Sequence, residues 1–254
     1  MRKSVIYCFV FVFSIVFVPF AFSQTANNGN EIIKKMSDKL SSAKTFSFST
    51  SEVHTRARMS GKKEDVQLQR DALIRRPNGM HYSFKGGRDW NMWYDGKFLT
   101  AVSDKEKGFI QASMPPTIDE TLDSIADRFD INMPVSDLMY SSPYDSFLGS
   151  NSKGGVVGSQ SIEGKVCDHL SYKSDYVDWE IWIGKNDSLP YQLILNNKDD
   201  AVNPRSQVIF RNWNLNAQAT DKDFAFVIPD GYHRIPIMEK VRIEEKSQTK
   251  PGSK

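Results

Sequence analysis

Cysteine is almost absent from this chain, which has two in 254 residues. Cys8 lies in an apolar amino-terminal run that has the features of a removable export signal, so Cys167 is the single thiol expected in the mature protein. One thiol cannot form an internal disulfide, and stability must therefore come from a packed core. A small exported protein without disulfides is more typical of a bacterial periplasm than of an animal secretome.

The chain also lacks an excess of charge of either sign. It has 33 Lys+Arg against 31 Asp+Glu, and removal of Arg2 and Lys3 with the export signal leaves 31 against 31. A nearly neutral mature chain has no basic field that would attract nucleic acid or anionic lipid. We therefore expect no nucleic-acid partner and no stable insertion into a membrane.

Recurrent catalytic and cofactor motifs are missing as well. The stretch Gly158–Ser161 lacks the second glycine of a nucleophile elbow, and no phosphate-binding glycine loop is present. We expect no enzymatic activity, no cofactor and no metal. Two alternatives stay open. Cys167 and His169 share a strand face, as in a thiol–imidazole pair or half of a metal site, and Asp178 and Glu180 share another, as in a paired-carboxylate hydrolase.

The amino terminus has the layout of a secretory signal peptide. Residues 1–3 are basic, residues 4–18 are almost wholly apolar, and Ala21-Phe22-Ser23 offers small residues at the cleavage positions. A membrane anchor is the alternative, but a spanning helix needs about 20 apolar residues, and this run is shorter and is broken at Pro19. We expect residues 1–23 to be cleaved, leaving a soluble protein in the periplasm.

What the mature chain has in abundance is aromatic residues, set in short runs with the period-two alternation of strands. Turn residues, such as Asp95-Gly96, separate the runs. The periodicity predicts a helix over Asn30–Ser42, about six strands, an insert with a helix over Ile118–Phe129 and a short helix from Pro134, and about six more strands ending at Phe224–Pro229. Tight turns between consecutive strands predict an antiparallel meander.

This order of elements contains no linker and no internal repeat, so we expect a single β domain over residues 24–239. The charged stretch that follows, residues 240–254, contains Pro, Gly and Ser and is expected to be disordered.

One face of the expected sheet is strongly apolar. Alternation places aromatic side chains from several strands on that face, and the Ile118–Phe129 helix could cover it with its own apolar stripe. An ordinary solid core has the same pattern as a ligand cavity, so periodicity leaves both interpretations open. The candidate hydrophobic groove consists of Phe46, Phe48, Tyr82, Phe84, Trp93, Leu122, Ile125 and Phe129.

A series of short motifs occurs in a recognisable order between Asn30 and Ile237. They are Arg76-Pro77-Asn78, Trp93–Lys97, Pro115–Asp119, Pro134–Leu138, Cys167–Leu170, Val177–Ile183, Leu189-Pro190 and Phe224–Pro229. Together they resemble an uncharacterised family of predicted periplasmic proteins, which is similar to the LolA-like lipoprotein carrier superfamily. No residue can be matched from the sequence to the arginine that locks the lid of those carriers.

The resemblance implies a mainly β (α+β) fold, a LolA-like unclosed antiparallel β half-barrel of about 11 strands with a helical lid. It implies a periplasmic binding or carrier protein that holds an apolar or lipidated ligand, such as an acyl chain, a lipid or a lipoprotein, between the curved sheet and the lid. The alternative is a non-enzymatic protein-interaction or envelope-stress sensor module on the same fold. The expected partners are thus a lipid or lipoprotein ligand and an envelope protein.

Overall fold

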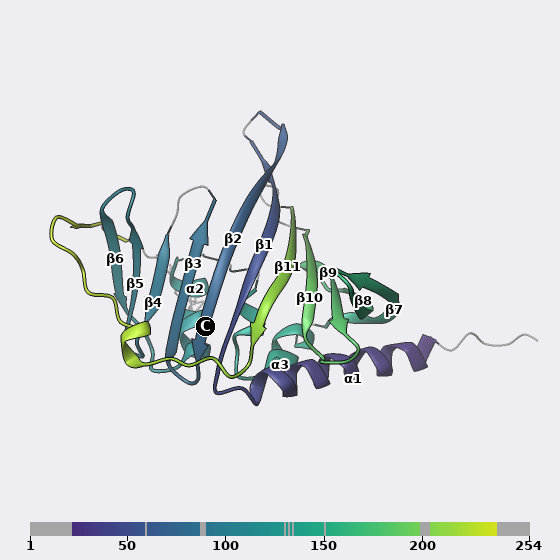
Figure 1. Ribbon diagram of the computed structural model, residues 1–254. Helices are drawn as coiled ribbons and strands as arrows, with labels where there is room; N and C mark the ends of the chain where they lie inside the picture. Colours follow the sequence, from purple (N-terminus) through teal and green to yellow (C-terminus); the bar gives the residue numbers. More distant parts are fainter. Residues whose placement is uncertain are drawn as a thin grey trace, which may run out of the picture.

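The structure is a computed structural model, and it describes residues 22–58, 60–86, 90–129, 131, 133, 135–149, 151–198 and 204–237 (Figure 1). The predicted signal peptide, apart from its last two residues, and the predicted tail at residues 240–254 lie outside these ranges. So does Pro134, at which the second helix of the insert was expected to begin. Among the described residues, no helix is long and apolar enough to cross a bilayer.

A twelve-stranded sheet forms the frame of the molecule, in the order β12-β6-β5-β4-β3-β2-β1-β11-β10-β9-β8-β7. Strands β1 to β11 pair only in antiparallel fashion, and β12 adds two residues in parallel to β6. The strands are β1 (Thr45–Ala57), β2 (Lys63–Arg75), β3 (Gly79–Lys85), β4 (Asn91–Tyr94), β5 (Phe98–Ser103), β6 (Gly108–Ser113), β7 (Lys153–Ile162), β8 (Lys165–Lys173), β9 (Val177–Gly184), β10 (Pro190–Asn197), β11 (Arg205–Asn214) and β12 (His233–Arg234).

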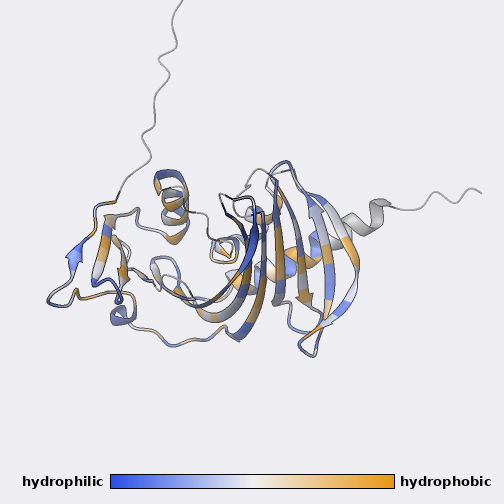
Figure 2. Ribbon diagram, turned by 90° about the horizontal axis from the view of Figure 1, so that it is seen from above, coloured by the Kyte–Doolittle hydropathy of each residue, from blue (hydrophilic) through white to orange (hydrophobic). Residues whose placement is uncertain are grey.

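The order is linear and its two end strands, β12 and β7, do not pair with each other, so the curved sheet is not closed. Seen from above, the strands bend around helices on their concave side (Figure 2). The predicted unclosed antiparallel half-barrel is therefore confirmed. Its eleven antiparallel strands match the expected number, and β12 is an addition at one edge.

Helices come from the amino-terminal segment and from the insert between β6 and β7. The insert begins with α2, whose predicted capping box is present: the Thr117 hydroxyl donates to Glu120 Oε2 (2.7 Å), and the Glu120 N–H donates to Thr117 Oγ1 (3.3 Å). The helical elements are α1 (Phe22–Ser41), α2 (Ile118–Phe129), the 3₁₀ turn η1 (Ser136–Leu138), α3 (Pro143–Leu148) and the 3₁₀ turn η2 (Asp221–Asp223).

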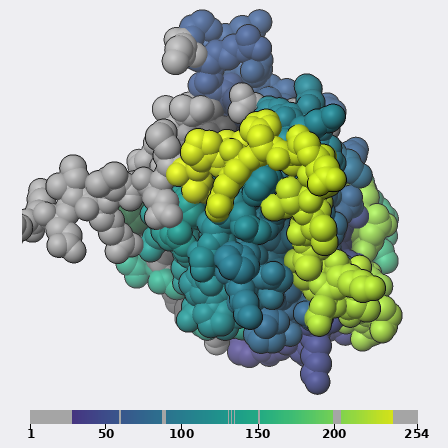
Figure 3. Space-filling model, turned by 90° about the vertical axis from the view of Figure 1, so that its left-hand side faces the viewer, coloured from purple at the N-terminus to yellow at the C-terminus, as the bar shows by residue number. Residues whose placement is uncertain are grey.

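The segment Phe224–Pro229 is not a strand, contrary to the expectation from its apolar sequence. Residues 215–237 instead run as a strap past β1 and β2 and then along the outer side of β3 to β6 (Figure 1 and Figure 3). Phe224 is buried there against Gly79, and Phe226 stacks on Trp93 with ring centroids 4.5 Å apart. The rings of Phe224 and Phe226 thus pack against the outer face of the sheet. The backbone of the strap forms strand pairing only at β12, with β6.

Candidate functional site

Seven of the eight predicted groove residues lie together on the concave face. Five of them are almost completely buried in one apolar core: Phe46, Phe48, Tyr82, Leu122 and Ile125. Phe84 and Phe129 are half-buried and pack against the same core. The sheet and α2 thus meet as their periodicity indicates.

Trp93, the eighth predicted residue, lies on the opposite face of the sheet. Its strand neighbour Tyr94 points inward and is buried, so alternation turns Trp93 outward. There it stacks on His81, the residue opposite it on β3, and on Phe226 of the strap. Trp93 therefore contacts the strap on the outer face of the sheet and does not line the concave face.

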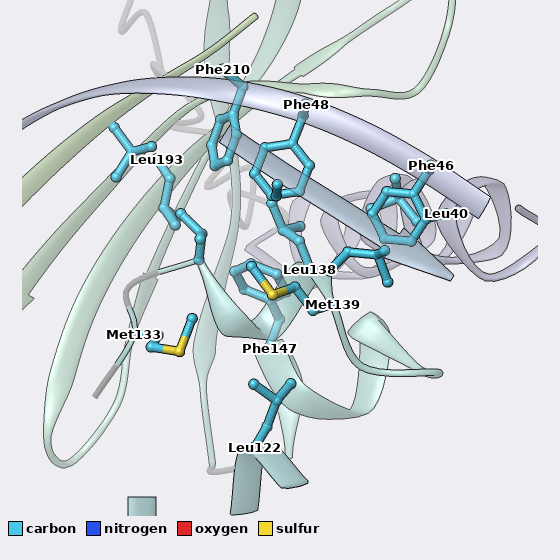
Figure 4. Close-up of a cluster of buried hydrophobic side chains, with 14 of the residues drawn as sticks. Leu40, Phe46, Phe48, Leu122, Met133, Leu138, Met139, Phe147, Leu193 and Phe210 are labelled. Atoms are coloured by element: carbon cyan, nitrogen blue, oxygen red, sulfur yellow. The ribbon is translucent and has the colours of Figure 1, made fainter. Parts of the chain in front are cut away.

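Residues of the insert that the sequence did not single out complete the concave core. Leu138, Met139 and Phe147 come from η1 and α3 and face Phe46, Phe48 and Phe210 of the sheet (Figure 4). They lie in short turns between Pro134 and Gly149, where no helical or strand period is long enough to reveal an inward face. Only their apolar character could have suggested burial.

The insert is held against the sheet by a few polar contacts around these apolar ones. Arg76 donates from Nη1 to the carbonyl oxygen of Met139 (2.7 Å), and the Ile118 N–H donates to the carbonyl of Pro77 (2.8 Å). The Tyr144 N–H donates to the Ser37 hydroxyl of α1 (3.0 Å). Two arginines connect the insert to the sheet in this way, because Arg128 of α2 also donates from Nη1 to the carbonyl oxygen of Ser113 in β6 (3.0 Å).

Arg76 is held in an unfavourable setting for a guanidinium. Burial lowers its pKa from the ordinary value, an effect that the charge of Asp119 partly opposes. Its Nε and Nη2 atoms are buried and have no hydrogen-bond partner among the described residues, and the group lies 5.2 Å from the centre of the Phe46 ring. An anchor with one hydrogen bond and a buried charge can be released at modest cost.

The concave face changes character along the strands. Cross-strand rows near the start of β1 are apolar, with Phe46 beside Ile74 and Phe48 beside Ala72. The next rows bring together the polar residues that we call the polar cluster. The polar cluster consists of Thr50, Glu52, His54, Arg70 and Ser206, and all five are buried.

Glu52 is the centre of the polar cluster. The Thr50 hydroxyl donates to Glu52 Oε1 (2.7 Å), His54 Nε2 lies 2.7 Å from Oε2, and Arg70 Nε lies 2.9 Å from Oε2. His54 Nδ1 is in turn 3.0 Å from the Ser206 hydroxyl. Burial by itself would raise the pKa of Glu52, but the hydrogen bond with His54 and the charge of Arg70 outweigh burial and lower it. The carboxylate is therefore ionised at neutral pH.

The residues of the two catalytic alternatives lie on the outer face of the sheet. His169 bonds to Glu180 (2.7 Å) and stacks on Trp182, while Asp178 pairs with Lys198 (2.8 Å). Burial raises the pKa of the Cys167 thiol, which disfavours the nucleophilic thiolate. In the described parts of the chain, no three His, Cys, Asp or Glu side chains gather as metal ligands would.

Two cavities in the described part of the molecule lie outside the concave face. One of about 440 Å³ is lined by outward residues of β1, β2 and β11 such as Ser51, Gln67 and Gln207. Another, of about 560 Å³, lies where α1 meets β1, beside Lys39 and Ala217. Between sheet and insert, side chains such as Phe46, Tyr82 and Leu138 have no exposed surface, and we call this arrangement the closed form.

A model of a protein family matches residues 29–238, and that family is described as predicted periplasmic protein (DUF2092). The match confirms the resemblance inferred from the motifs. No curated protein sequence matches the chain.

Solved structures resemble the chain at low identity. A LolA superfamily protein from Nitrosomonas europaea is 11% identical, with a TM-score of 0.38 over 78% of this chain and 98% of that one. A DUF1329 family protein from Desulfovibrio piger is 10% identical, with a TM-score of 0.39 over 79% and 97%. MucB in the Pseudomonas aeruginosa MucA/MucB complex is 12% identical, with a TM-score of 0.44 over 78% and 61%.

Proposed function

The chain belongs to this family of predicted periplasmic proteins, and on that premise we propose that it is a binding or carrier protein that holds an acyl chain of a lipid or lipoprotein between its sheet and its insert. The observation that carries the proposal is the aromatic concave face, covered by a separate helical segment that a few polar contacts hold in place.

The covered face suits an acyl chain because its side chains offer apolar contact area, and apolar contacts do not require a particular orientation of the ligand. Each CH₂ group removed from water contributes about 0.8 kcal/mol to binding. The chain of the ligand therefore needs an apolar channel and no specific polar partners. Met80, Met114, Met133 and Met139 lie in this core, and unbranched thioether side chains can repack around chains of different shape.

Binding requires the insert to move, since sheet and insert are packed together in the closed form. Short elements joined by turns, with η1 of three residues and α3 of six, are more easily displaced than long helices. A ligand that replaces the contacts of the insert with contacts of its own would favour the open form. Release would follow when the insert closes again.

The position of Trp213 provides a direct test. Its ring packs on Phe48 at 4.7 Å between centroids, on the concave face, whereas Trp182 lies on the outer face of β9. A fatty acid brominated along its chain quenches tryptophan fluorescence only on contact. We expect quenching of the purified protein at micromolar concentrations, a clear reduction of it in Trp213→Phe, and no reduction in the control Trp182→Phe.

A second readout is independent of the added probe. The protein purified from the periplasm is extracted with organic solvent and the extract is analysed by mass spectrometry, and an acyl compound in near-stoichiometric amount is expected. An empty extract together with an absence of quenching would show that the concave face is only a core. Equal loss of quenching in both tryptophan variants would place the ligand elsewhere.

A further inference from the structure

The concave face is amphipathic along its strands. Its first two rows across β1, β2 and β3 are Phe46–Ile74–Met80 and Phe48–Ala72–Tyr82. The third row is Thr50–Arg70–Phe84, and the fourth begins with Glu52. These rows form an apolar stripe that ends at a buried guanidinium, and the acyl channel that we propose follows this stripe.

The guanidinium of Arg70 is poorly satisfied by the protein. The side chain is 7% exposed, its Nε lies 2.9 Å from Glu52 Oε2 without an aligned hydrogen bond, and its guanidinium lies beside the Tyr82 hydroxyl. The guanidinium also lies 4.6 Å from the centre of the Phe84 ring and 5.8 Å from that of the Tyr82 ring. Beyond Glu52 and the Tyr82 hydroxyl, the described residues give the guanidinium no acceptor.

The hydroxyl of Tyr82 is a second unmet donor at the same place. Tyr82 is completely buried, the Arg70 guanidinium faces its hydroxyl oxygen, and the hydroxyl proton has no acceptor among the described residues. Burial raises the pKa of Tyr82 far above its usual range, so the group remains a neutral O–H donor. A buried polar group without a partner costs about 1–3 kcal/mol, which is a reason to look for a ligand that pairs with it.

The Glu52 carboxylate, the acceptor beside Arg70, already has partners. It accepts a hydrogen bond from the Thr50 hydroxyl, lies 2.7 Å from His54 Nε2 and forms the ion pair with Arg70. What the polar cluster offers to the channel is thus donors alone. The group that completes it must supply acceptor oxygens and no donor.

We propose that Arg70 and Tyr82 form the subsite for an anionic oxygen head group, a carboxylate or phosphate, of the acyl ligand whose chain lies along Phe48 and Phe46. This inference rests on the proposed function and specifies its ligand class. Two oxygens of a carboxylate or phosphate match the donors of the Arg70 guanidinium and the Tyr82 O–H, and charge-assisted bonds to a guanidinium are about twice as strong as neutral ones. Glu52 acts as a positioning residue, because its contact with Nε turns the Nη edge toward the channel.

The proposal also explains why the buried ion pair of Arg70 and Glu52 is present where apolar residues could give the core the same stability. Buried ion pairs contribute little net stability, since desolvation offsets their attraction. On the β3 side Arg70 is flanked by Phe84 and Tyr82, and on the β1 side by Thr50 and Glu52. A guanidinium buried between an aromatic row and one carboxylate is the feature expected of a site that receives a charged group.

The test compares compounds that share a chain and differ in the head group. Lauric acid, lauryl phosphate and lauryl alcohol compete with an uncharged, apolar fluorescent dye for the full mature protein. We expect the acid or the phosphate to bind about tenfold tighter than the alcohol, consistent with one charge-assisted pair. A preference for the acid identifies a fatty-acid ligand, and a preference for the phosphate identifies a phospholipid-type head group.

Two variants test the residues without leaving an unpaired buried charge. Tyr82→Phe removes the hydroxyl alone, and the double variant Arg70→Met with Glu52→Gln removes both charges of the pair. Each should weaken binding of the preferred anion, the double variant by about tenfold, and leave binding of the alcohol unchanged. Arg75→Met, which changes an arginine of the same strand on the outer face, should leave all three affinities as they are.

The outcomes separate the two proposals. If none of the three compounds binds, the proposed function fails and the head-group subsite falls with it. If all three bind with the same affinity, or if the variants keep the preference for the anion, the acyl channel stands and the subsite is wrong.

Discussion

Glu52 shows at the residue scale how a polar side chain can belong to the interior of this sheet. Its side chain has no exposed surface, yet it remains ionised because three donors surround it. Burial acts against ionisation, while the hydrogen bond with His54 and the charge of Arg70 act for it and prevail. Protonation of Glu52 therefore removes the favourable interactions of its carboxylate with His54 and Arg70.

A dependence of stability on pH follows from the lowered pKa of Glu52. The unfolded chain, in which the pKa of this carboxyl is near its ordinary value of 4.5, binds the proton more readily than the folded protein does. The contribution of Glu52 is therefore complete above about pH 4.5 and is lost as the pH falls through the folded pKa. Urea unfolding between about pH 7 and pH 3 measures this loss.

The slope of unfolding free energy against pH distinguishes the contribution of Glu52 from that of other carboxylates. Glu52→Gln lowers stability at neutral pH because Arg70 loses its partner, and it should also flatten the decline in acid. The pKa of Glu64 is also lowered, by its hydrogen bond with Arg58, but water screens this exposed pair, so Glu64→Gln should leave most of the decline in place. An unaltered slope in Glu52→Gln would show that the polar cluster is not the acid-sensitive element.

At the scale of elements, the insert between β6 and β7 is tied to the sheet by a few hydrogen bonds, which involve Ile118, Arg76 and Arg128. The capping box and the spacing of Ile118, Leu122 and Ile125 define α2 locally. The position of the insert depends on apolar packing and on the contact of Arg76 with the Met139 carbonyl. Its independent motion is what the proposed uptake of a ligand requires.

Removal of the Arg76 anchor should loosen the insert selectively. A net loss of about 1 kcal/mol for one hydrogen bond corresponds to roughly fivefold more frequent opening. In Arg76→Gln we expect backbone amides of residues 136–148 to exchange with deuterium severalfold faster, while amides of β1 and β2 keep the parent rate.

Arg75→Gln is the matched control, because Arg75 is the neighbour of Arg76 in sequence but pairs with Asp221 on the outer face. It should not change exchange in the insert. A uniform increase over the whole sheet in Arg76→Gln would contradict the independent motion of the insert, as would unchanged exchange of residues 136–148.

At the scale of the whole molecule, the strap of residues 215–237 covers one outer flank of the sheet (Figure 3). The Arg75 guanidinium lies 4.6 Å from the centre of the Phe224 ring, and the Tyr232 hydroxyl donates to Asp104 (2.7 Å). β12 then pairs with β6 and so covers an edge that would otherwise expose unpaired backbone groups. The strap thereby completes the half-barrel from outside.

Alanine substitutions along the strap should have graded effects. Phe224 is fully buried, Phe226 is half-buried on Trp93, and Val227 is 86% exposed. Phe224→Ala is expected to cost about 3–5 kcal/mol of unfolding free energy, Phe226→Ala about 1 kcal/mol, and Val227→Ala close to nothing. Denaturant unfolding measures all three. Equal effects of the three substitutions would mean that the strap is not docked on β3 and β4.

The sequence by itself determined the course of the chain and one face of the sheet. Period-two alternation identified Phe46, Phe48 and Tyr82 as inward residues, and the capping box placed the start of α2, because both signals depend only on neighbours in sequence. Short turns between strands likewise imposed antiparallel pairing. These local rules were enough for the half-barrel and for most of its aromatic face.

Only the tertiary structure decided which of these residues meet distant partners. Trp93 was expected in the groove as one more aromatic residue, but its alternation with Tyr94 turns it outward, where Phe226 arrives from a strap more than a hundred residues away in sequence. Thr50, Glu52 and His54 form a pattern typical of a solvated strand end. They are buried because the register places Arg70 and Ser206 beside them, and such long-range pairing leaves no trace in local sequence.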